Sequence, residues 1–153
     1  MLVALDAQGL PNGHMAAVAL GALYAPLRQQ FADLNIEGVL VLNGELLLLQ
    51  RGNLKDARSA CIRYDWKQMA PWLAGLQPQP PTAKRVQWMD LGQVEGVPLT
   101  LTDGSPLRGG AWAFTAVAES TDSSYADGAC VASAVGIVAP KNLDPAITAT
   151  LQA

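Results

Sequence analysis

The chain has 153 residues, of which 50% are hydrophobic and 15% are charged, and its formal net charge is −3. This composition predicts one globular domain over residues 1–153 and excludes a disordered chain. The negative charge argues against a nucleic-acid partner, because phosphate recognition requires a basic face.

The first part of the chain predicts a hairpin and a short helical turn. Residues 1–6 and 14–20 are apolar runs, and residues 10–13 (LPNG) have the composition of a turn. Pro26 can then open one helical turn that runs through Phe31. No apolar run approaches the ~20 residues of a membrane helix, so we expect no membrane partner.

A second hairpin is predicted around Asn43-Gly44, a dipeptide typical of tight turns between antiparallel strands. Its strands cover residues 38–42 and 45–51. Residues 46–49 are four consecutive leucines, whereas a strand with one wet face would alternate. We therefore expect this strand to be buried on both faces.

The remainder of the chain also consists mainly of predicted strands. Residues 59–66 predict one strand, after which Asp65 can cap a short helix. Further strands are predicted at residues 84–91, 97–102, 112–119, 130–138 and 147–151. With nine or ten strands and no long helix, the sequence predicts an all-β protein.

Two parts of the chain repeat the same order of strands, turn and polar loop. Corresponding positions are Leu20-Gly21 with Leu91-Gly92, and Cys61 with Cys130. Four strands in ~50 residues is the period of a propeller blade. We therefore predict about two and a half four-stranded antiparallel blades, made of outer strands in 1–20, a blade in 38–91 and a blade in 97–151. The alternative is a sandwich or barrel of about ten strands.

Cysteine and histidine usage limits the possible chemistry. Cys61 and Cys130 lie in predicted strands, which favours buried free thiols in a reducing, cytoplasmic compartment. His14 is the single histidine, which argues against multi-histidine metal sites and a Ser-His-Asp triad.

Polar residues are expected to gather on one rim of the blades, where first strands begin and second strands end. These residues are Glu37, Asn53, Glu95, Glu119, Asp122 and Asp127. Carboxylate and amide oxygens suit a divalent cation such as Ca²⁺, which could also activate water. The alternative is that these side chains bond their own turns. Tyr125 could donate to a ligand, and the basic residues Arg51, Lys55 and Arg58 are interpreted as a solvated loop.

Two segments carry a resemblance to a known family: residues 35–53 (NIEGVLVLNGELLLLQRGN) and residues 116–128 (AVAESTDSSYADG). Together they resemble an uncharacterised bacterial β-propeller family, itself distantly similar to esterase-like phytases and to the gluconolactonase/regucalcin group. The resemblance implies a six-bladed ring with acidic residues at the channel mouth. It implies Glu37 and Glu119 as rim acids and Asn53 as a weaker match.

Two functions are therefore considered, and catalysis is left open. The first is a ligand-binding or hydrolase-like domain that holds Ca²⁺ through Glu37, Glu119 and Asn53, with Glu95, Asp122, Tyr125 and Asp127 near a small-molecule ligand. The second is a non-catalytic segment whose bare apolar blade faces drive self-association. In either case we expect a homo-oligomer, most simply a dimer.

Overall fold

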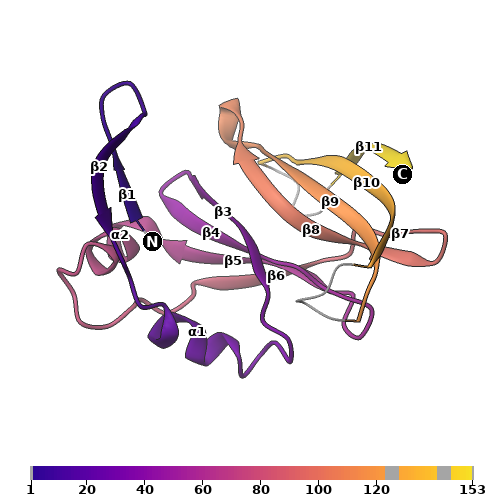
Figure 1. The fold of residues 1–153 in the computed structure, drawn as a ribbon, viewed down its shortest axis with the longest axis horizontal. Helices are drawn as coiled ribbons and strands as arrows, with labels where there is room; N and C mark the ends of the chain where they lie inside the picture. Colours follow the sequence, from indigo (N-terminus) through magenta and orange to yellow (C-terminus); the bar gives the residue numbers. More distant parts are fainter. Residues whose placement is uncertain (1, 123–127, 141–145, 153) are drawn as a thin grey trace.

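The computed structural model describes residues 2–122, 128–140 and 146–152 and is built mostly of antiparallel β-sheet (Figure 1). A hairpin, a four-stranded sheet and a five-stranded sheet follow one another along the chain. No helix in the described ranges is long and apolar enough to cross a membrane.

The first sheet has the strand order β3-β4-β5-β6, so each strand pairs with its neighbour in sequence. Its strands are β3 (Ile36–Leu42), β4 (Glu45–Gln50), β5 (Ser59–Asp65) and β6 (Arg85–Met89). Asn43 and Gly44 form the predicted tight turn, with φ of 50° and 77°. The predicted hairpin and third strand are thus confirmed.

Strand β4 is buried on both faces, as the four consecutive leucines predict. Leu47 and Leu49 face the second sheet, whereas Leu46 and Leu48 face the helices α1 (Gly21–Leu27) and α2 (Trp66–Leu73). The outer cover therefore comes from helices of the same chain.

The N-termini of α1 and α2 differ in how they agree with the sequence predictions. Asp65 caps α2 as predicted, because its side chain accepts a hydrogen bond from the Lys67 amide at 2.8 Å. The prediction for α1 was wrong: the helix begins at Gly21, and Pro26 lies in its last turn. A proline there removes a single intrahelical bond from a seven-residue helix, which packs through Leu23 and Leu27.

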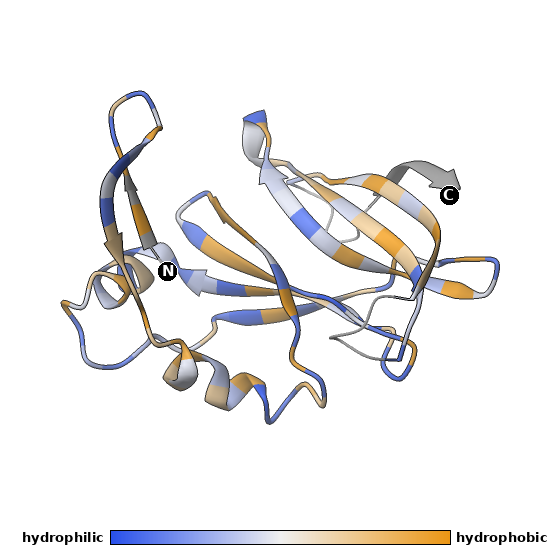
Figure 2. Ribbon diagram, viewed as in Figure 1, coloured by the Kyte–Doolittle hydropathy of each residue, from blue (hydrophilic) through white to orange (hydrophobic). Residues whose placement is uncertain are grey.

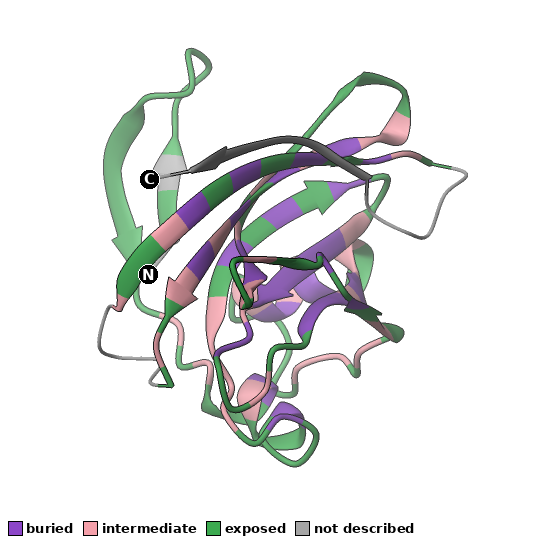
Figure 3. Cartoon of the chain, turned by 90° about the vertical axis from the view of Figure 1, so that its right-hand side faces the viewer, coloured by how far each residue is buried: buried purple, intermediate pink, exposed green. Residues whose placement is uncertain are grey.

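The second sheet has the order β11-β10-β9-β8-β7. Its strands are β7 (Gln93–Val94), β8 (Val97–Pro106), β9 (Trp112–Ser120), β10 (Ala129–Val138) and β11 (Ala146–Gln152), with a short 3-10 turn η1 (Arg108–Gly110) between β8 and β9. Burial alternates along β10, where purple and green follow each other in Figure 3. One face of this sheet therefore packs inward and the other faces solvent.

A single core lies between the two sheets. It is formed by alternate residues of both sheets, including Leu47, Leu101 and Phe114; apolar residues lie along β3, β9 and β10 in Figure 2. The buried Ser59 hydroxyl accepts a hydrogen bond from the Leu101 amide at 3.0 Å, so one polar contact crosses this core.

The first hairpin, β1 (Leu2–Leu5) with β2 (Pro11–Ala16), stands apart from both sheets (Figure 1). Its turn covers residues 6–10, where residues 10–13 were predicted, because Asp6 Oδ1 accepts hydrogen bonds from the amides of Gln8 and Leu10, both at 2.9 Å. Pro11, Asn12 and Gly13 begin β2 instead. The hydrogen bonds of the Asp6 side chain thus set the position of the turn, although Asn12-Gly13 is also a typical turn sequence.

Two consecutive antiparallel meanders are present, as the repeat predicted, but the second has five strands in place of four, and the two pack face to face on a shared core. This packing fits the sandwich alternative more closely, and a propeller arrangement is not confirmed. Cys61 lies in β5 and Cys130 lies in β10. Cys61 is buried as expected, whereas Cys130 is exposed, because it lies at the open start of β10 beside a register shift.

Candidate functional site

Arg51 joins the two sheets at one end of the shared core. It follows β4 directly, and its guanidinium lies 3.7 Å from Glu37 of β3 and pairs through Nη2 with Oε2 of Glu119 at the end of β9. The side chains of Arg51 and Glu119 are only 15% and 12% exposed. Water therefore screens this inter-sheet ion pair less than it would a surface pair.

Buried polar groups hold the backbone around Arg51. The Gln50 side chain donates to the carbonyl oxygens of Asp33 at 2.9 Å and Arg51 at 2.6 Å. Its Oε1 accepts from the Asn35 amide at 2.8 Å. Gln50 thus ties the segment before β3 to the end of β4, which fixes where the Arg51 side chain begins.

The loop that follows Arg51 is organised by Asn53. Its Oδ1 accepts from the amides of Lys55 at 2.9 Å and Asp56 at 3.1 Å, and its Nδ2 donates to Asp33 Oδ2 at 2.8 Å. Gly52 is required in this loop, because a Cβ there would lie 2.6 Å from the backbone of Ala57. In this structure Asn53 therefore bonds its own loop and the segment that precedes β3.

The other predicted site residues that the structure describes, Asp122 and Glu95, lie in two different places. Asp122 is exposed and pairs with Lys55 at 3.4 Å, so it does lie beside the Arg51 loop. Glu95 lies in the exposed turn between β7 and β8, with φ of 50°. Tyr125 and Asp127 fall outside the described residues.

Glu37 and Glu119 thus converge as the sequence predicted, but on an arginine of the same chain. Among the described residues, no group of three or more His, Cys, Asp or Glu could hold a metal ion. The calcium site stays a prediction. The interpretation of Arg51 as part of a solvated loop was wrong. Its position in the sequence could have indicated burial, because Arg51 directly follows β4, whose last five residues are buried.

A separate feature is an apolar groove of about 820 Å³ between the β1–β2 hairpin and the first sheet. Val3 and Leu5 line it from the hairpin, and Leu46 and Leu48 lie on its floor. The consecutive residues 37–41 of β3 all line it. Because successive side chains of a strand point to opposite faces, the groove must run along the edge of β3.

This edge of β3 carries unpaired backbone groups in the described part of the chain, where β3 pairs with β4 alone. Leu42 and Glu45 flank the two-residue turn and form a hydrogen-bonded pair. The amides and carbonyls of Val39 and Val41 therefore point away from β4. Both side chains are exposed, 56% for Val39 and 41% for Val41.

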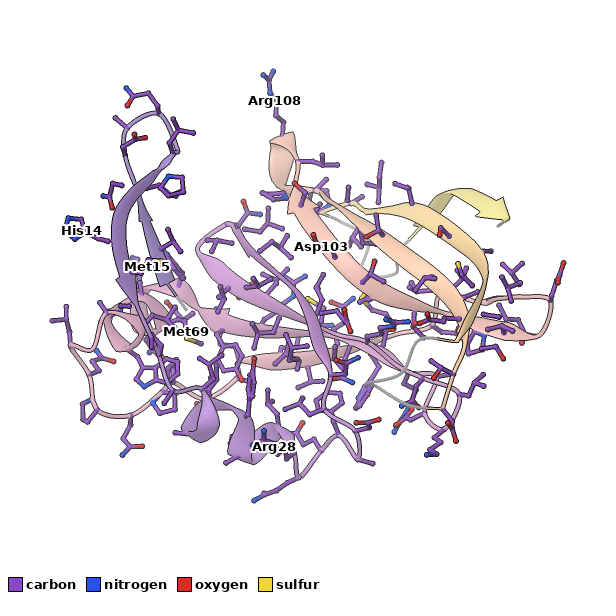
Figure 4. The ribbon with its side chains drawn as sticks, in the orientation of Figure 1. His14, Met15, Arg28, Met69, Asp103 and Arg108 are labelled. Atoms are coloured by element: carbon purple, nitrogen blue, oxygen red, sulfur yellow. The ribbon has the colours of Figure 1, made fainter. Side chains whose placement is uncertain are left out.

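The hairpin that forms the other wall is itself exposed along all of β2 (Figure 3). Val3 pairs directly with Met15, so these two apolar side chains share the face that lines the groove. Figure 4 shows Met15 on the side toward the first sheet and His14 pointing away from the molecule. An isolated two-stranded hairpin is only marginally stable in water.

Comparison with known proteins assigns the chain to one family. No curated protein and no solved structure matches the chain significantly. These searches thus give no support to the expected likeness to esterase-like phytases, gluconolactonase/regucalcin proteins or other propellers. The match that covers residues 1–153 shows that the chain belongs to the family of unknown function DUF6910.

Proposed function

We propose that this domain is a non-catalytic interaction module that binds a second copy of itself through the groove between the β1–β2 hairpin and β3. The observation that carries the proposal is an exposed hairpin beside an unpaired strand edge. In the proposed dimer, each copy places its hairpin in the groove of the other and covers the β3 edge.

A second copy fits this surface because the surface is self-complementary. A two-fold dimer brings the same patch of both subunits together. Here the patch contains both the exposed apolar side chains of Leu5 and Met15 and the apolar groove beside them. An exposed edge strand readily pairs with another strand, which gives the association backbone hydrogen bonds as well as apolar contact.

The mass in solution tests this proposal. Light scattering across a dilution series should give 32.2 kDa for the wild type, twice the 16.1 kDa of one chain. Val39→Lys should give a folded monomer, because the charge lies on the exposed edge and blocks strand pairing. Leu76→Lys, at an exposed apolar residue that does not line the groove, is the matched control and should remain dimeric.

Two outcomes would overturn the proposal. One is a wild type that stays monomeric at every concentration. The other is a Val39→Lys protein that dimerises as well as the wild type, since the β3 edge would then play no part.

A second proposal is the divalent-cation function, ligand-binding or hydrolase-like, at the rim. It is supported by the convergence of Glu37 and Glu119, and it requires Arg51 to move aside, because a guanidinium and Ca²⁺ repel each other there. Calorimetry with calcium should then show binding to the wild type and weaker binding to Glu119→Gln. Absence of heat in both proteins would remove this function.

We also propose, as a more specific account of the fold, that the strands are arranged as propeller blades. This arrangement is supported by the two consecutive antiparallel meanders, of which the first has the four strands of one blade. In that form the two arcs of the dimer would close one ring. A structure of the dimer in which the two copies share no common axis of blades would reject it.

A further inference from the structure

A second cavity, of about 390 Å³, opens where the core between the sheets ends near the β3–β4 turn. We call it the mouth pocket; Arg63, Lys84, Arg85, Glu45, Asn43 and Trp112 are among its lining residues. The β8–β9 turn closes one side, because Gly110 packs so tightly on Asn43 that a Cβ would lie 2.8 Å from Nδ2. The pocket is of the size that small ligands occupy in proteins.

The register of the first sheet explains why charged side chains line this end of an apolar core. Arg63 lies two residues after Cys61, which faces the second sheet, so Arg63 points to the same side. Arg85 is its direct cross-strand partner. The two arginines therefore face the second sheet just beyond the point where apolar packing stops.

The mouth pocket has an excess of positive charge. Arg63, Lys84 and Arg85 line it, and the single acidic residue among its described lining residues is Glu45. Glu45 contacts Arg63 at 3.1 Å and Lys84 at 2.9 Å. The lining thus carries two net positive charges in a chain whose net charge is −3.

Trp112, which lines the pocket from the second sheet, has a hydrogen-bond donor that no described residue uses. Trp112 is 2% exposed, and its Nε1–H is buried without a hydrogen-bond partner among the described residues. The Cε3–Cζ3 edge of the indole faces Gly104, so the Nε1 side is turned away from β8. A buried donor without an acceptor is unfavourable, so an acceptor at this point stabilises the fold.

We propose that the mouth pocket binds a small molecule bearing an oxyanion, a carboxylate or a phosphate group, that accepts a hydrogen bond from Trp112 Nε1–H and pairs with Arg85. Arginine presents a planar fork of donors that matches both kinds of oxyanion. Leu42 and Val138 also line the pocket and provide apolar contact for the body of such a molecule. The site is independent of the groove and needs no second copy.

The test follows the indole N–H signals of the four tryptophans by proton–nitrogen correlation NMR, with the Trp112 signal assigned by its loss in Trp112→Phe. Succinate and inorganic phosphate are titrated separately. We expect a saturable shift of the Trp112 signal with at least one probe. Arg85→Gln should weaken that binding roughly ten-fold or more, because it removes the charge-assisted hydrogen bonds to the oxyanion.

Arg28→Gln is the matched control, because Arg28 lies beside α1, outside the mouth pocket (Figure 4). It should bind like the wild type. A response to one probe but not the other supports the proposal and identifies the oxyanion. The proposal is overturned if neither probe moves the Trp112 signal, or if Arg85→Gln binds as tightly as the wild type.

Discussion

The two sheets share a core but differ in what covers their outer faces. Behind the first sheet, Leu46, Leu48 and Ile62 are buried beneath α1 and α2. On the second sheet, the equivalent outward residues Val135 and Ile137 are 44% and 38% exposed. One sheet is therefore an inner layer of the domain and the other is an outer layer.

The difference follows from the connections between strands. One helix precedes β3 and another joins β5 to β6, whereas in the described part of the second sheet the connections contain only η1. Strand composition follows the cover: in the first sheet the outward positions beneath the helices are apolar, as at Leu48 and Ile62, whereas the outward positions of the second sheet include Thr115 and Ser133. A strand with polar and apolar residues in alternation needs no second cover.

The largest expected effect comes from placing a charge on each outer face. Leu48→Glu puts a carboxylate under the helices with no partner, and we expect it to abolish folding, since an unpaired buried charge costs several kcal/mol. Val135→Glu, the same charge on the open face, should change stability by less than about 0.5 kcal/mol. Urea unfolding measures both, and equal effects would contradict the inner-layer and outer-layer distinction.

The inner face of the second sheet should be as intolerant as the first sheet. The Phe114 ring packs on Gly136, where a Cβ would lie 2.1 Å from Cζ. We expect Gly136→Ala to lower the unfolding free energy by about 3 kcal/mol, through overpacking. Val135→Ala, one residue away on the open face, is the control. A Gly136→Ala protein as stable as the wild type would show that this face is loosely packed.

A smaller effect is expected for the polar contact that crosses the core. Ser59→Ala leaves the Leu101 amide without its acceptor in a dry interior, at a cost of about 2 kcal/mol. Ser133→Ala, on the exposed face of β10, should be close to neutral. Thermal or chemical unfolding of the two variants separates them, and a neutral Ser59→Ala would mean that the bond contributes nothing.

The smallest expected effect is a pH-dependent loss of stability that distinguishes the buried Cys61 from the exposed Cys130. Burial raises the pKa of the Cys61 thiol to about 11 from its ordinary 9.0. The unfolded chain therefore ionises first as the pH rises, so the stability present below pH 9.0 is progressively lost toward pH 11. At pH 10 the loss should be about 1 kcal/mol.

Cys61→Ala should flatten this decline, whereas Cys130→Ala should leave it unchanged because Cys130 is exposed. In the native wild type, a thiol reagent should modify one cysteine quickly and the other slowly. Rapid modification of both thiols, or an unchanged decline in Cys61→Ala, would contradict the difference in burial.

Local patterns were sufficient to predict much of the fold. The Asn43-Gly44 turn, the doubly buried β4 and the Asp65 cap are each specified by a few neighbouring residues. What covers β4 could not be predicted in the same way. Consecutive leucines require a layer on each side, but a helix and another sheet satisfy that requirement equally well.

The candidate sites could likewise be predicted only in part from local sequence patterns. The convergence of Glu37 and Glu119 was predictable, since both lie where strands begin or end on one rim. That Arg51 lies between them was not, because its burial depends on how the second sheet packs on the first. The groove beside β3 and the unpartnered Trp112 Nε1–H likewise arise from tertiary packing alone.

Hydrogen exchange at the Val39 and Val41 amides tests the self-association most directly, because these groups point from β3 into the groove. If each hairpin covers the β3 edge of the other copy, both amides should exchange slowly at high protein concentration and faster on dilution below the dimer dissociation constant. Fast exchange of both amides at every concentration would contradict the proposed dimer.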